Sequence, residues 1–131
     1  MPNSSNYNLD DRIKMALLTT LLIGLIALLH VYFLILEMFL WDKPTGRRVF
    51  KLTPEFATAS KALAANQGLY NGFLAAGLLW GLSLGVEGLH IKLFFLACVL
   101  IAGIFGAMTV SRRIFYIQGL PALLALILLL A

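Results

Sequence analysis

Glu37 lies inside an apolar stretch, residues 15–41, that holds no other acidic residue. An ionisable side chain in such a setting is costly and commonly functional. His30 lies seven residues earlier on nearly the same helical face, about 10 Å away along the axis at ~1.5 Å per residue. The pair could move a proton or hold the polar end of a ligand. We expect Glu37 to be hydrogen-bonded within the protein, by amides of another helix or by His30, because an unpaired charge in lipid is too costly.

Polar side chains also interrupt the next apolar segment, and Gln118 opens the last one. Their spacing of four residues places amides and a phenol at one depth on a contiguous helical face: Asn66, Gln67, Tyr70 and Asn71. They could bind Glu37 or a ligand's head. They could also serve only to join helices, at about 0.6 kcal/mol each. The whole set with Glu37 favours a ligand site, since joining helices does not require a carboxylate.

Composition fixes the class of protein. The chain of 131 residues is 61% hydrophobic and 12% charged, whereas about a quarter of residues in soluble domains are charged. We predict an all-α membrane protein with a polar tail over residues 1–14 and a four-transmembrane-helix bundle over residues 15–131. The helices are predicted at about 15–41, 54–84, 92–110 and 114–131, since each holds enough apolar residues to cross a bilayer.

Basic residues set the expected orientation. Lys and Arg gather in the predicted first and third loops, which the positive-inside rule assigns to the cytoplasm: Lys43, Arg47, Arg48, Lys51, Lys61, Arg112 and Arg113. Both termini are therefore expected to be extracytoplasmic, with the polar residues of the candidate site in the cytoplasmic leaflet. The net charge of +4 then faces anionic membrane lipid, or attracts an anionic substrate. No nucleic-acid motif accompanies it, so no nucleic-acid partner is expected.

Small residues predict close helix packing. Gly68, Gly72 and Ala76 recur every four positions, as do Gly77, Gly81 and Gly85, and such stripes let backbones approach. Two stripes on one helix exceed what a single neighbour requires, which favours a homo-oligomer. The histidines and Cys98 form no metal motif, so no metal is expected, and the pattern names no cofactor or catalytic residue.

Several runs of residues resemble a bacterial integral membrane family known as a domain of unknown function, which implies a multi-pass protein of the bacterial inner membrane. The resemblance covers nearly everything after the tail and implies no activity. It rests on His30-x-Tyr32, Leu36-Glu37-Met38-Phe39-Leu40-Trp41, Leu52-Thr53-Pro54-Glu55-Phe56, Ala64-Ala65-Asn66-Gln67-Gly68-Leu69-Tyr70-Asn71-Gly72-Phe73-Leu74-Ala75 and Gln118-Gly119-Leu120-Pro121-Ala122.

A looser resemblance links the chain to the membrane-associated proteins in eicosanoid and glutathione metabolism, four-helix enzymes that form trimers with the active site between subunits. Arg47-Arg48-Val49-Phe50 resembles an Arg-Arg element after their first helix, and Asn66 and Tyr70 resemble two residues of their Arg-x-x-x-Asn-x-x-Glu-Tyr motif. Ala62 and Leu69 stand where that motif has Arg and Glu. The resemblance implies a trimer rather than a dimer, but without the groups that bind glutathione.

Three functions stay open. The first is a site, binding or enzymatic, for an amphiphilic or small hydrophobic ligand, in which Arg47 or Arg48 attracts an anionic group and Asn66 and Tyr70 orient it. The second is a small proton-coupled multidrug-type transporter that uses Glu37, for which a two-fold dimer would be expected. The third is a scaffold or accessory subunit. The candidate ligand-binding residues are His30, Glu37, Arg47, Arg48, Asn66, Gln67, Tyr70, Asn71 and Gln118.

Overall fold

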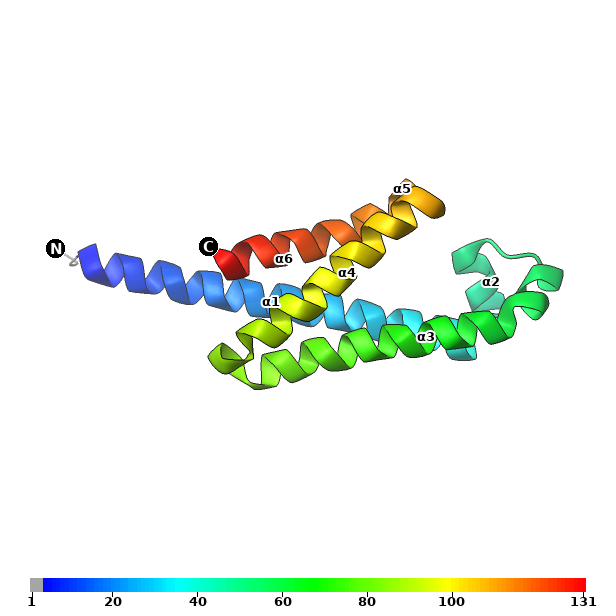
Figure 1. Ribbon diagram of the computed structural model, residues 1–131, viewed down its shortest axis with the longest axis horizontal. Coiled ribbons are helices and arrows are strands. Elements are labelled where there is room, and N and C mark those ends of the chain that lie inside the picture. The colour runs from blue at the N-terminus through cyan, green and yellow to red at the C-terminus, as the bar shows by residue number, and fades with distance from the viewer. Residues whose placement is uncertain (1–3) are drawn as a thin grey trace. The chain divides into compact units, whose positions relative to one another are not determined.

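The computed structural model describes the backbone of residues 4–131 and the side chains from residue 8 onward. Over this range the chain is helical, with short connections and no strand, so the all-α prediction is confirmed. The elements follow one another along the chain as drawn in Figure 1: α1 (Ser4–Phe39), α2 (Pro44–Phe50), α3 (Pro54–Ser83), the 3-10 helix η1 (Gly85–Gly88), α4 (Leu89–Thr109), α5 (Arg112–Ile114), the π-helical turn η2 (Phe115–Gly119) and α6 (Leu120–Leu130).

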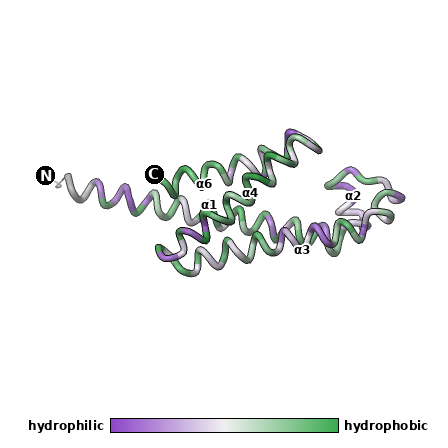
Figure 2. Tube along the Cα trace, in the orientation of Figure 1, coloured by the Kyte–Doolittle hydropathy of each residue, from purple (hydrophilic) through white to green (hydrophobic). Residues whose placement is uncertain are grey.

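Three helical stretches of the described chain are long and apolar enough to cross a membrane: Asn8–Phe39, Gly85–Thr109 and Arg112–Leu130. By length and composition they support a helical membrane protein. α3 is 30 residues long but is not among them. Figure 2 shows hydrophilic residues interrupting α3, whereas α6 is almost uniformly hydrophobic. The polar side chains of the candidate site thus lower the hydropathy of this helix, and its crossing of the membrane stays a prediction.

Helix boundaries follow local sequence. α3 begins at Pro54, as predicted, because the Thr53 hydroxyl accepts a hydrogen bond of 3.2 Å from the backbone N–H of Phe56. α1 differs from the prediction: it begins at Ser4, since residues 4–14 hold no Gly or Pro to stop it. Residues 1–3 of the predicted tail lie outside the described residues.

The segment after α1 also differs from expectation. The sequence predicts a turn over residues 42–46, yet Pro44 opens the short helix α2. Proline fits the first turn of a helix because its missing N–H would have no partner there. Lys51 ends α2 in the left-handed conformation, with φ 55°. α2 carries Arg47 and Arg48 in its last turn.

The chain forms two compact units. We call Ala27–Gly77 the loop unit, because it contains α2 and the connections on either side of it. The hairpin unit consists of the described part of Met1–Ile26 together with Leu78–Ala131. α1 and α3 each contribute residues to both units.

Within the loop unit, two glycines of α3 face the second half of α1. A Cβ added at Gly68 would lie 2.7 Å from Met38 Cγ and 3.0 Å from Glu37 Cβ. A Cβ at Gly72 would lie 2.6 Å from Leu34 Cδ1. These distances are shorter than ordinary contact, so a side chain at either position would force Met38 or Leu34 to move. The close packing predicted from the small residues is therefore present at these positions.

Within the hairpin unit, α4 packs against η2 and α6, as Figure 1 shows. A Cβ added at Gly103 would lie 2.6 Å from the backbone nitrogen of Gly119, so the two backbones are in contact. Pro121 lies just after the π-helical turn, has no N–H to donate to the residue four before it, and crowds that residue's carbonyl, which disfavours a regular helix here. The Leu120 N–H instead donates to the carbonyl of Phe115.

Candidate functional site

Glu37 and Asn71 form the polar centre of the loop unit. The Asn71 side-chain amide donates to Glu37 Oε1 at 2.9 Å, and the two residues are only 8% and 6% exposed. Gly68 allows α3 to approach α1 closely enough for this bond. The expectation that Glu37 is hydrogen-bonded within the protein, by an amide of the next long helix, is confirmed.

His30 is fully buried in α1, and its ring lies edge-on to Phe33 with centroids 6.0 Å apart. The structure assigns the Glu37 hydrogen bond to Asn71. A role for His30 in binding a ligand or moving a proton stays a prediction.

Asn66 and Tyr70 lie on a different face of α3. The Asn66 amide donates to the Tyr70 hydroxyl at 3.1 Å. Both side chains are exposed, Tyr70 to 48%. Because a helix turns by about 100° per residue, this pair faces away from Gly68 and Gly72, which contact α1. Gln67 is also exposed. The predicted polar face is thus divided into a buried part, Asn71, and an exposed part.

Arg47 and Arg48 extend from α2, which is held close to the end of α1. Gly46 is buried there, with no room for a side chain against the backbone of Leu40. Arg48 is exposed, whereas Arg47 is half-buried. Among the described residues, no group accepts a hydrogen bond from the buried Nε of Arg47. Buried donors are nearly always paired, so this atom could serve an acceptor from outside the chain.

The connection that carries these arginines is tied to the start of α3. The Trp41 indole donates to the Ser60 hydroxyl at 3.0 Å. Lys61 Nζ and Asp42 Oδ2 form an ion pair at 3.1 Å. The hydrogen bond from Lys61 lowers the pKa of Asp42 below its ordinary value of 3.8. These contacts hold α2 in place beside α3 within the loop unit.

Gln118 lies in η2 and is half-buried. It belongs to the hairpin unit, whereas the other candidate residues belong to the loop unit. That Gln118 serves the same ligand as those residues stays a prediction.

Lys92 is a polar residue that the sequence analysis assigns to no site. It is only 9% exposed, and its ammonium donates to the carbonyl of Gly85 at 3.1 Å. Its aliphatic chain runs beside Gly81, where an added Cβ would lie 2.7 Å from Lys92 Cγ. The pattern that could have revealed it is a lysine one turn after the glycine-rich break at Gly85 and Gly88.

The described residues contain no group of three or more His, Cys, Asp or Glu side chains that could hold a metal ion. What the loop unit offers is hydrogen bonding: a buried carboxylate-amide pair, an exposed amide-phenol pair and two guanidinium groups. These can recognise a polar or anionic group next to apolar surface.

Comparison with known proteins identifies the family. The family model described as "Protein of unknown function (DUF1304)" matches residues 24–130. The chain belongs to the DUF1304 family. The match includes the whole loop unit and every candidate residue, and it confirms the resemblance to a family of unknown function.

A relative of this DUF1304 chain is "Uncharacterized protein YpaA" from Lactococcus lactis subsp. lactis (strain IL1403). The two are 34% identical over 115 residues, which cover 86% of this chain and 97% of the relative. No solved structure matches.

Proposed function

We propose that this DUF1304 protein binds an amphiphilic or small hydrophobic ligand, whose polar end lies against the loop unit in the cytoplasmic leaflet. In this proposal the protein crosses the bacterial inner membrane four times, α3 included, with both termini extracytoplasmic. It assembles as a homo-oligomer, a trimer rather than a dimer. No catalytic residue or cofactor is part of the proposal.

The proposed ligand site rests on the exposed Asn66–Tyr70 pair. Its neighbours along α3 are large apolar side chains turned outward, among them Leu63 at 75% and Phe73 at 56% exposed. A polar pair on such a surface in a bilayer is costly unless a second polar partner meets it. Within this chain the pair has only its mutual hydrogen bond of 3.1 Å among the described residues. We infer that the partner is a ligand head held at a contact between subunits.

The loop unit supports an anionic or strongly polar head for that ligand. Arg48 is exposed, and the buried Nε of Arg47 lacks an acceptor among the described residues. The chain loosely resembles membrane-associated glutathione enzymes, whose active site lies between subunits. This resemblance supports a ligand site at a contact between subunits. Ala62 and Leu69 replace their Arg and Glu, so glutathione itself is not the proposed ligand.

A second candidate rests on Glu37. Its carboxylate is buried and accepts a hydrogen bond from one neutral amide, rather than from a cation. A carboxylate in this setting can take up a proton when its partner is absent or displaced, which is what proton-coupled multidrug-type transport requires. Proton-coupled uptake that Glu37→Gln abolishes would favour this candidate over the first.

The first proposal is tested with purified Asn66→Leu and Tyr70→Phe variants. We expect both to keep the oligomer size and melting temperature of the parent, because exposed groups contribute little to folding. Ligand retention, measured by mass spectrometry of bound small molecules, should fall about 5- to 150-fold, as expected for losing ~1 to 3 kcal/mol in a desolvated site.

Tyr32→Phe is the matched control, since it removes another exposed phenol, on α1 and outside the candidate residues. It should retain the ligand. If Asn66→Leu and Tyr70→Phe retain every molecule that the parent retains, the ligand proposal is wrong and a scaffold role is favoured. Loss of the oligomer in these variants would instead return the pair to a purely structural role.

A further inference from the structure

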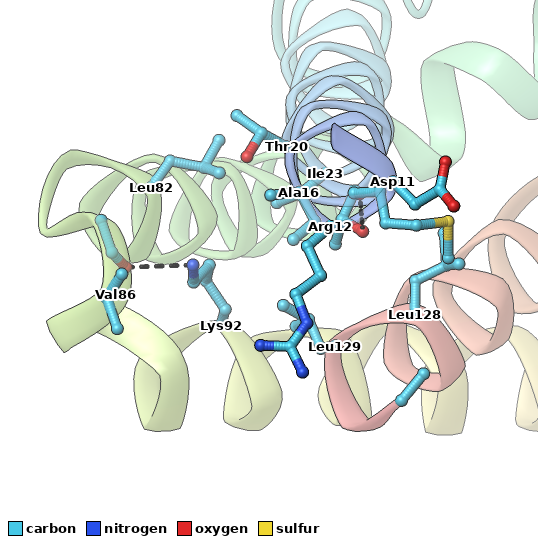
Figure 3. A pocket seen from close by; sticks show the side chains of 14 residues that line it. Asp11, Arg12, Ala16, Thr20, Ile23, Leu82, Val86, Lys92, Leu128 and Leu129 are labelled. Atoms are coloured by element: carbon cyan, nitrogen blue, oxygen red, sulfur yellow. Dashed lines mark hydrogen bonds between the residues drawn. The ribbon is translucent and has the colours of Figure 1, made fainter. Parts of the chain in front are cut away.

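The hairpin unit contains an open groove of about 780 Å³. Its walls come from residues 11–23 of α1, the end of α3 with η1, the start of α4 and the end of the chain. Figure 3 shows the side chains that line it. This groove is separate from the residues on which the proposed function rests, because all of its lining residues belong to the hairpin unit. Its volume falls within the range of about 300 to 1,000 Å³ typical of small-molecule sites.

Two cations reach the groove from different helices. Arg12 extends from α1 into the space beside Leu129, and Lys92 enters from α4 (Figure 3). Lys92 is 9% exposed, and its ammonium donates one hydrogen to the Gly85 carbonyl. Two ammonium hydrogens remain for another acceptor. Among the described residues, neither cation forms an ion pair. The carboxylate of Asp11 also borders the groove, but it points away from Lys92 in Figure 3.

The remaining walls are mainly apolar, formed by side chains such as Met15, Ile23, Leu82 and Leu128. The groove therefore combines an apolar surface with positive charge contributed by two elements. That combination complements a molecule with an acyl chain and an anionic head. Basic side chains that lie beside apolar surface at a membrane interface attract anionic lipid headgroups.

We propose that this groove binds an anionic phospholipid, with its phosphate between Arg12 and Lys92 and one acyl chain along the apolar wall. A phosphate is favoured over a fatty-acid carboxylate because a guanidinium on one side and an ammonium on the other supply enough donors for several phosphate oxygens. The lipid thereby bridges the start of α1 and the start of α4. This proposal does not depend on the ligand site of the loop unit.

The test is native mass spectrometry of the full chain, released from detergent micelles that contain phosphatidylglycerol, phosphatidylcholine or oleate at equal concentration. We expect phosphatidylglycerol to be retained in preference to the other two. Arg12→Gln should reduce that preference about fivefold, the factor that corresponds to one basic residue near an anionic headgroup. Lys92→Gln should reduce it at least as much, and its melting temperature reports whether the variant is folded.

Lys14→Gln is the matched control, because it removes a positive charge two residues from Arg12 but outside the groove lining. It should leave the preference within about twofold. An equal loss in Lys14→Gln and Arg12→Gln would mean general surface attraction and would overturn the proposal. Equal retention of phosphatidylglycerol and phosphatidylcholine, or preferential retention of oleate, would overturn it as well. Unchanged lipid retention in Arg12→Gln and a folded Lys92→Gln would also count against it.

Discussion

At the scale of single residues, the sequence predicts what kind of group pairs with Glu37 but not which residue supplies it. The cost of a carboxylate in lipid requires a hydrogen-bond donor, and the sequence offers the amides of α3 and His30 as candidates. The choice of Asn71 depends on which side of α3 meets α1. Gly68 and Gly72 decide that side through close contacts with Leu34 and Met38, and those contacts require coordinates.

Removing the amide should cost more than neutralising the carboxylate. Asn71→Leu leaves the buried Glu37 oxygen without its donor, which costs ~1 to 3 kcal/mol or more for a charged group. Glu37→Gln keeps a side chain of the same size that can still hydrogen-bond Asn71, so we expect a smaller loss. The measurement is thermal or denaturant unfolding of both variants in one detergent.

Gln67→Leu serves as the control for this comparison, because Gln67 is exposed one turn away from Asn71. Its stability should lie within about 0.5 kcal/mol of the parent. If Asn71→Leu were as stable as Gln67→Leu, the Glu37–Asn71 bond would have no structural importance.

At the scale of helices, the sequence predicts where α3 begins better than which face it presents, whereas the starts of α1 and α2 differ from the prediction. The Thr53 cap and Pro54 predict the start of α3 because capping is local. The polar residues of α3 were expected to form a contiguous face, but steps of about 100° separate Asn66 and Tyr70 from Asn71. The π-helical turn could not be predicted either. It combines a local effect of Pro121 with the close contact between Gly103 and Gly119, and that contact joins residues far apart in the sequence.

Two glycine-to-alanine substitutions separate the effect of close helix packing on stability from the effect of helix propensity. Gly103→Ala should destabilise the protein by about 1 to 3 kcal/mol, because its Cβ would press on the backbone of Gly119 and force α4 away from η2. Gly24→Ala meets nothing within 4 Å and should stabilise α1 by up to about 1 kcal/mol. Unfolding of the two variants in parallel measures both effects. Equal stabilities would contradict the close packing of α4 on η2.

At the scale of the whole molecule, composition predicts the membrane class and the helical architecture, and the structure agrees. The number of crossings depends on α3, whose apolar character is reduced by the same polar residues that define the candidate site. The ligand could not be predicted, because hydrogen-bonding groups such as Asn66 and Tyr70 specify a polar head but not the molecule attached to it.

Topology can be measured directly. If α3 crosses the membrane and basic loops stay in the cytoplasm, a reporter that is active only outside the cytoplasm should be active when fused after Ala131. The same reporter inserted after Lys51, between α2 and α3, should be inactive. Activity of a cytoplasm-dependent reporter at Ala131 would contradict the predicted orientation. Equal behaviour at both positions would contradict the three crossings, by α3, α4 and the C-terminal stretch, that are predicted between them.

The length of α1 has a consequence for the surrounding bilayer. Its apolar part, residues 15–39, follows the charged residues 10–14 and is about 38 Å long at ~1.5 Å per residue. The stretch Arg112–Leu130 has 19 residues and is about 28 Å long by the same measure. A hydrocarbon core is about 30 Å thick. The C-terminal stretch therefore matches the membrane, whereas the apolar part of α1 exceeds it by about 8 Å. This hydrophobic mismatch must be relieved by tilting α1, by thickening the lipid around it or by extending its first turns into the headgroup layer.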